Sequence, residues 1–269
     1  MRKGLFISVD GPNGAGKTTF IKRLARNVDQ RFAILENEYG AAGIDGARLG
    51  QNRQGTQKNV WEMTEQCICC IGKKDFAASV LTIANVVDPE YLIVEPTGVG
   101  SLARIIENLR QIEYERIQLL SPVTIVDVYS YRRYMAEYPE LYQDQIRSAD
   151  TIIVSKTEAC QAEEKQRIQK FLQEINPQAK IITDYASTMT REDYQSLLLG
   201  GRYEKEVQDT QSGEKMPETF SFENIRMEAP ETLWCFLEQI IRGAFGNIIR
   251  AKGQLSLIHI SEPTRQEAI

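Results

Sequence analysis

A short stretch near the start of the chain, GPNGAGKT from Gly11 to Thr18, carries the clearest chemical pattern in the sequence. It fits G-x-x-x-x-G-K-[ST] at every fixed position. Glycines let a loop curl so closely that its backbone N–H groups can surround a polyphosphate, and Lys17 adds a positive charge for the β- and γ-phosphates. The Thr18 hydroxyl suits magnesium, and a helix that begins here turns its positive end toward the anion. The predicted phosphate-binding residues are Gly11, Asn13, Gly14, Ala15, Gly16, Lys17, Thr18 and Thr19.

Three of the five cysteines are crowded together as Cys67, Cys69 and Cys70. Thiols this close can converge on one soft cation, and a helix expected from Lys73 onward would favour their thiolate form. A closed structural zinc site takes four ligands. The site is therefore either open or completed by a distant residue, which suits an ion that is passed on. Buried thiols or a fixed zinc site are the alternative.

Two further segments could respond to a nucleotide. ENEYGAAGIDGARL, beginning at Glu36, is rich in glycine and acids, which is typical of a loop, and it lies where a nucleotide-sensing switch would follow the first strand–helix–strand unit. Glu95 ends an apolar run and is followed by Thr97 and Gly98, as in a Walker B ending. Glu95 could hold magnesium through water or orient the attacking water, and the Gly98 amide could sense the γ-phosphate. A surface loop and a helix-capping glutamate are the respective alternatives.

The sequence SKTE, from Ser155 to Glu158, follows another apolar run. It stands where a guanine-reading [NT]-K-x-D would occur. A carboxylate there accepts from the N1–H and N2–H₂ groups of guanine, and the stem of Lys156 packs over the ring. Glu158 keeps the acceptor on a longer arm, and Ser155 is shorter than the usual amide. The pattern therefore favours guanine over adenine.

The elements that must position these residues alternate between strand and helix from Gly4 to about Thr183. This alternation predicts an α/β fold, a mostly parallel sheet flanked by helices, with ligands at the carboxyl edge. Within it, residues 119–127 read as one strand, and the aromatic stretch 129–142 as a pair of helices. The isolated Cys160 and Cys235 read as ordinary buried residues.

The predicted domains are a P-loop domain at 1–202, a linker at 203–217 and the beginning of a truncated α+β domain at 218–254. In the last, a helix at 230–242 should bury Leu233, Phe236, Leu237, Ile240 and Ile241. Residues 255–269 resemble a translated sequencing adaptor and are expected to be non-native. They contain the only histidine, His259, which is given no role.

Composition excludes several classes of protein. The chain has 269 residues and a formal net charge of -5, which argues against nucleic acid and anionic membranes as partners. No apolar run approaches the roughly 18 residues of a membrane span. An odd number of cysteines does not fit a secreted disulfide framework, so we expect a cytoplasmic protein. The oligomeric state considered besides the monomer is a homodimer.

The motifs GPNGAGKTT, ENEYG with GID, CICC, EPTG, SKTE and RAKG follow one another as in the CobW-like P-loop GTPases, relatives of the UreG and HypB nickel chaperones. The sequence resembles this family from about Leu5 to Gly253. The resemblance implies a GTPase that uses GTP and magnesium and handles a divalent transition metal, zinc or cobalt. The metal would pass to a client protein or cofactor-pathway enzyme.

The resemblance assigns magnesium or catalytic duty to Glu95, beside Lys17 and Thr18. It assigns metal ligation to Cys67, Cys69 and Cys70, helped by Glu36 and Glu38. Two departures stand out: Ala41 replaces the last acid of the family's E-N-E-F-G-E loop, and SKTE replaces N-K-x-D. Two rivals stay open, namely a small-molecule kinase or ATPase with structural cysteines and a non-catalytic nucleotide-gated regulator.

Overall fold

The computed structural model describes residues 4–12, 14–37, 59–63, 73–96, 98, 100–113, 117–199, 201–207, 229–246 and 248. The chain divides into two compact units, Met1–Thr219 and Phe220–Ile269. In the first unit the strands are β1 (Gly4–Asp10), β2 (Phe32–Asn37), β3 (Asn59–Met63), β4 (Tyr91–Glu95), β5 (Ile117–Leu119), β6 (Val123–Asp127), β7 (Thr151–Ser155) and β8 (Lys180–Ile182). The helices are α1 (Lys17–Asn27), α3 (Lys73–Val86), α4 (Leu102–Arg110), α5 (Tyr131–Glu137), α6 (Pro139–Arg147), α7 (Ala162–Ile175), α8 (Tyr185–Thr188) and α9 (Arg191–Leu198).

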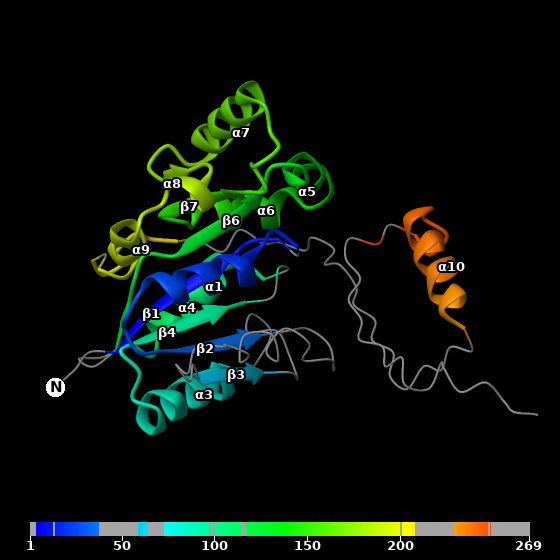
Figure 1. The fold of residues 1–269 in the computed structure, drawn as a ribbon. Coiled ribbons are helices and arrows are strands. Elements are labelled where there is room, and N and C mark those ends of the chain that lie inside the picture. Colours follow the sequence, from blue (N-terminus) through cyan, green and yellow to red (C-terminus); the bar gives the residue numbers. More distant parts are fainter. Residues whose placement is uncertain are drawn as a thin grey trace, which may run out of the picture. The chain divides into compact units, whose positions relative to one another are not determined.

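The strands form one sheet in the order β3-β2-β4-β1-β6-β7-β8, with β5 beside β1. Figure 1 shows the part of this sheet from β3 to β7. Every pairing between these strands is parallel. The predicted α/β class is therefore confirmed. Because the strands are parallel, their carboxyl ends meet at one edge, and the segments that follow β1, β2, β4, β6 and β7 all begin there.

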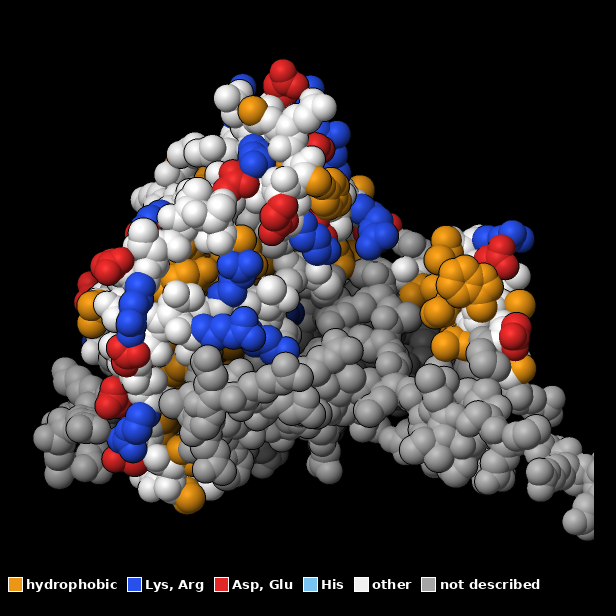
Figure 2. Space-filling view, in the orientation of Figure 1, with side chains coloured by type: hydrophobic (Ala, Val, Ile, Leu, Met, Phe, Trp, Pro, Cys, Tyr) orange, Lys and Arg blue, Asp and Glu red, His pale blue; other side chains and the backbone are white. Residues whose placement is uncertain are grey.

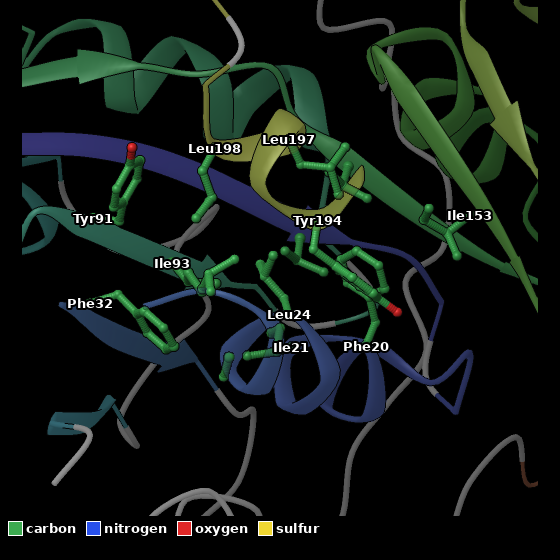
Figure 3. Packing of buried hydrophobic residues seen from close by; sticks show 14 of the residues in the cluster. Phe20, Ile21, Leu24, Phe32, Tyr91, Ile93, Ile153, Tyr194, Leu197 and Leu198 are labelled. Carbon is green, nitrogen blue, oxygen red and sulfur yellow. The ribbon is translucent and has the colours of Figure 1, made fainter. Parts of the chain in front are cut away.

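One face of the sheet is covered by α1 and α9, and Figure 3 shows their side chains meeting over the strands. Phe20, Ile21 and Leu24 of α1 are fully buried and pack with residues of α9 such as Leu198. The Phe20 ring meets Tyr185 of α8 edge to face, with centroids 5.6 Å apart. Each such side chain contributes about 1.5–3 kcal/mol by leaving water. This packing fixes α1, and with it the loop from which α1 starts.

The opposite face carries α4 and α6. Alternate residues of β6 show the division: Val123 and Ile125 belong to the core under α1, whereas the Thr124 hydroxyl donates to the carbonyl of Gln145 in α6 at 2.8 Å. A strand places successive side chains on opposite faces, so this alternation follows from strand geometry. The aromatic stretch forms the predicted helix pair, α5 and α6, in which Tyr131, Tyr134 and Tyr142 are buried.

Some predictions of elements are wrong. Residues 119–127 are not one strand, since Pro122 lies between β5 and β6 and lacks the N–H that a continuous ladder needs. Strand β3 and helices α8 and α9 were missed. Cys160 is half-buried rather than buried.

The second unit contains α10 (Pro230–Ile241). The prediction that this helix buries its apolar face is wrong, because Phe236 is 43%, Leu237 39% and Ile241 85% exposed, and Cys235 is exposed as well. Within this unit, the residues that the structure describes are α10 and the turn after it, so no described element of the unit covers that face. The predicted strands around it lie outside the described residues, as do most of the linker and the whole of residues 255–269.

Acidic and basic side chains are interspersed over the described surface seen in Figure 2. The described helices include none with the length and apolar character of a membrane span.

Candidate functional site

The loop between β1 and α1 has a backbone that only glycine adopts at low cost. Gly11, Gly14 and Gly16 have φ values of 134°, 81° and 101°, all in the left-handed region. A Cβ atom on Gly11 would lie 2.2 Å from the carbonyl oxygen of Ile125 in β6. The loop therefore passes so close to the neighbouring strand that no side chain fits at position 11.

Lys17 closes this loop on itself. It is the first residue of α1, it is 6% exposed, and its Nζ donates to the carbonyl oxygen of Gly11 at 2.7 Å. The ammonium thus lies against the start of the loop, beside the positive end of the helix. A polyphosphate bound in the loop would offer this ammonium stronger acceptors than a neutral carbonyl.

Thr18 and Glu95 come together although they are far apart in sequence. The Thr18 hydroxyl donates to Glu95 Oε1 at 3.0 Å. Glu95, at the carboxyl end of β4, is 5% exposed. The alternative role for Glu95 as a helix cap is wrong, because the helix that follows, α4, is capped by Ser101, whose side chain accepts from the backbone N–H of Arg104 at 3.2 Å. Glu95 therefore faces the P-loop helix.

The SKTE segment is joined to the P-loop by Ser155. Its hydroxyl lies 2.6 Å from the carbonyl oxygen of Ala15, to which it donates, and 3.3 Å from that of Val126. Ser155 is buried, whereas Lys156 and Glu158 are exposed. The structure thus brings the predicted base-reading residues to the same edge of the sheet as the phosphate-binding loop.

Gly98 is held from the other face of the sheet. Gln145 of α6, 1% exposed, donates through Nε2 to the carbonyl oxygens of Gly98 at 3.4 Å and Gly100 at 3.1 Å. A helix distant in sequence therefore restrains the segment after Glu95.

Asp10, the last residue of β1, is completely buried directly before the loop. Its Oδ1 accepts from the Gly11 N–H at 2.7 Å, and its Oδ2 has no hydrogen-bond partner within the described part of the chain. Burial raises the pKa of this carboxyl from 3.8 to about 7. Lys17 and the Gly11 N–H act in the opposite direction, and nearby Asp144 adds to the rise. A carboxyl that titrates near neutral pH thus lies under the P-loop.

The predicted metal ligands are mostly outside the described residues. That holds for Cys67, Cys69, Cys70 and Glu38, and also for Asn13 of the loop. The backbone of Glu36 is described, in β2, where it is in register with Glu95 of β4. Among the residues that the structure describes, no cluster of three or more His, Cys, Asp or Glu side chains is placed to hold a metal.

Sequence reasoning missed Asp10, Asp127 and Gln145. Asp10 directly precedes the loop motif, and Asp127 ends an apolar strand as Glu95 does, so both had a positional signal. Gln145 had none, because a glutamine within a helix is unremarkable until the fold places it against a loop.

The family is decided by residues 5–183, which match the family model described as "CobW/HypB/UreG, nucleotide-binding domain". The chain belongs to this family. Its relatives by sequence include the zinc chaperone YeiR of Escherichia coli, 29% identical over 177 residues, which are 65% of this chain and 53% of YeiR. Another is the zinc chaperone CobW of a Sinorhizobium species, 29% identical over 181 residues, with 57% of this chain and 51% of the relative covered. The chain spans about half the length of these relatives.

Solved structures share the fold of this chain. Zn(II)-bound YjiA GTPase from E. coli aligns with a TM-score of 0.53 at 17% identity, over 90% of this chain and 78% of that one. The hydrogenase maturation factor HypB from Archaeoglobus fulgidus aligns with a TM-score of 0.52 at 18% identity, over 73% and 89%. At these identities the likeness concerns the fold alone.

Proposed function

We propose that this protein is a GTP-hydrolysing metallochaperone, which binds a divalent transition metal at Cys67, Cys69 and Cys70 and delivers it to a client protein or cofactor-pathway enzyme. The observation that carries the proposal is the convergence of Lys17, Glu95 and the Ser155 loop at one sheet edge, joined by the Thr18–Glu95 and Ser155–Ala15 hydrogen bonds. The relatives named zinc chaperones support zinc as the first metal to test, with cobalt as the second.

The sheet register supports coupling between nucleotide and metal. Glu36 and Glu95 are register partners in adjacent strands, whose backbones in a sheet lie about 4.8 Å apart. Glu36 begins the predicted metal-binding acidic loop, and Glu95 contacts the P-loop helix through Thr18. Strand β3, which precedes the cysteines in the sequence, is paired with β2 in parallel, so it ends at the same edge. A change in the contacts of Glu95 would therefore act on the strand next to Glu36, one of the predicted metal ligands.

Magnesium fits the oxygen donors at the P-loop, because the Thr18 hydroxyl and the Glu95 carboxylate lie within 3.0 Å of each other and are of the hard type that this ion prefers. Thr18 would hold the ion directly and Glu95 through water. When bound, magnesium would neutralise charge on the phosphates.

In GTP hydrolysis, each of the site residues would have a separate role. Lys17 would leave the Gly11 carbonyl and bind the β- and γ-phosphate oxygens, where it stabilises the charge that develops as the phosphoryl group leaves. The loop N–H groups from Gly14 to Thr19 would orient the triphosphate. Glu95 would orient the water that attacks the γ-phosphate. The Glu158 carboxylate would accept hydrogen bonds from the N1–H and N2–H₂ groups of guanine. The Gly98 N–H would bind the γ-phosphate, with its carbonyl held by Gln145.

The test measures turnover and metal binding on one preparation, purified without chelator. We expect GTP hydrolysis, lost in Lys17→Ala, and about one zinc or cobalt ion per chain, lost in Cys69→Ser. The metal dissociation constant should differ between GTP-bound and GDP-bound protein. Cys235→Ser, which removes an exposed cysteine of α10, is the matched control and should retain the metal.

A preference for ATP, or activity that is indifferent to metal and chelator, would contradict the proposal and favour a kinase or ATPase. Nucleotide binding without turnover would favour a regulator instead. Location in the cytoplasm and a homodimer stay predictions, as do the linker at 203–217 and the non-native tail at 255–269.

A further inference from the structure

The residue that would cover the face of the base, Lys156, has an unusual backbone. Its φ is 61°, in the left-handed region that a lysine adopts only at a cost. Such a conformation persists only when the surroundings hold it. The groups that hold this loop should therefore matter to whatever Lys156 does.

Asp127 holds the Lys156 side chain. The two residues come from the ends of neighbouring strands, with Asp127 in register with Ser155. Lys156 Nζ donates to Asp127 Oδ2 at 2.5 Å, and the backbone N–H of Tyr129 donates to Asp127 Oδ1 at 2.8 Å. The side chain of Asp127 is only 7% exposed. With both of its oxygens engaged, this carboxylate has a fixed orientation and offers the ammonium a fixed partner.

The loop is fixed on its other side by Thr157, which is only 2% exposed. Asp184, just after β8, is paired with Lys165 at 2.6 Å, and its pKa is lowered by Lys165 and by Thr157. The segment that carries Lys156 is therefore anchored on both flanks. The Lys156 side chain is nevertheless 48% exposed, so its aliphatic stem stays accessible while its ammonium is held.

We propose that Asp127 is a positioning residue for the nucleobase: by binding the ammonium of Lys156, it holds the lysine stem in the plane where it packs over a guanine ring. The inference rests on the proposed function, since it requires a bound guanine nucleotide. A lysine that is free in solution loses rotamer freedom when a base docks on it. Here the ion pair removes much of that freedom before binding, so the base meets a preorganised surface.

The test is a double-mutant cycle on the full chain, with the dissociation constant for GDP measured by calorimetry. Asp127→Asn keeps an acceptor for the Tyr129 N–H and removes the charge. Lys156→Met keeps an aliphatic stem and removes the ammonium. We expect each to weaken GDP binding about three- to tenfold, as the immobilisation of one long side chain predicts, and the combined variant to be no weaker than either alone.

Three measurements separate positioning from a general structural effect. Inorganic pyrophosphate, which lacks a base, should bind all variants with about the wild-type affinity. Lys156→Arg, which can still pair with Asp127, should recover most of the GDP affinity, and this arm stands even where Asp127→Asn does not fold. Arg202→Met breaks a different ion pair, to Glu113 at 3.2 Å, and should leave GDP binding unchanged.

The inference is overturned if Asp127→Asn binds GDP as the wild type does, if the losses of the two single variants multiply in the combined one, or if pyrophosphate binding falls in parallel. If the wild-type protein binds no guanine nucleotide, both the proposed function and the inference about Asp127 are overturned. Wild-type protein that binds GDP and passes the zinc test, with variants that are unaffected, would overturn the role of Asp127 alone.

Discussion

Asp10→Asn should make the protein more stable at alkaline pH than the wild type. The carboxyl is completely buried, and its pKa rises from 3.8 to about 7 chiefly because burial disfavours the ionised form. At about 1.4 kcal/mol for each pKa unit, the ionised carboxylate costs the folded state about 4 kcal/mol at pH 8. The attraction of Lys17 and the Gly11 N–H already lowers this cost, and the repulsion of Asp144 adds to it.

The sign follows from proton binding. Between pH 3.8 and about 7 the folded state holds more protons at Asp10 than the unfolded state does, so the free energy of unfolding falls as pH rises through this window and is level above it. Asparagine does not titrate, and its side-chain oxygen can still accept from the Gly11 N–H. Its buried NH₂ group costs about 1–3 kcal/mol at every pH. The variant should therefore gain about 3 kcal/mol relative to the wild type between pH 5 and pH 8.

Urea unfolding at pH 5, 6, 7 and 8 measures this gain directly. Asp29→Asn, which removes an 80% exposed side-chain carboxylate paired with Arg191, is the matched control and should gain no stability over the wild type between pH 5 and pH 8. Parallel curves for Asp10→Asn and the wild type across this range would refute the reasoning, since they would mean that Asp10 does not change its protonation on folding.

Three other predictions concern the same edge of the sheet. Gly11→Ala should lower the free energy of unfolding in urea by at least about 3 kcal/mol, because its Cβ would meet the Ile125 carbonyl. Gly14→Ala, with no described atom within 4 Å of its Cβ, should lower it clearly less. Equal losses for the two variants would contradict the close approach of Gly11 to Ile125. Ser155→Ala should lower the free energy of unfolding by about 1–3 kcal/mol and weaken GTP binding, since it removes the donor to the Ala15 carbonyl. An unchanged GTP affinity in a titration would show that the P-loop and the SKTE loop act independently. Glu95→Gln should lower kcat for GTP at least about 100-fold while GDP affinity stays near wild type, and an unchanged kcat in a phosphate-release assay would remove Glu95 from the reaction.

The sequence by itself determined what depends on neighbours along the chain. The loop from Gly11 to Thr18 is readable because a backbone that turns this tightly requires glycines at fixed intervals. The α/β alternation is readable because strands and helices have different hydrophobic periods, and the helix pair over 129–142 follows from the same signal. The cysteine cluster could be identified but not placed, and it lies outside the described residues.

Only the tertiary structure decided which distant residues meet. The sheet order β2-β4-β1-β6-β7 differs from the order in the chain, so the partners of Thr18, Ala15 and Lys156 come from strands far away in sequence. The burial that raises the pKa of Asp10 likewise depends on elements packed over it rather than on its neighbours. In α10, the helical spacing of apolar residues predicted a buried face, but these residues are exposed. Burial requires another element packed against the helix, and the spacing within one helix does not show whether such an element is present. Local pattern fixes the shape of each segment, whereas contacts and charges at the site depend on how the segments assemble.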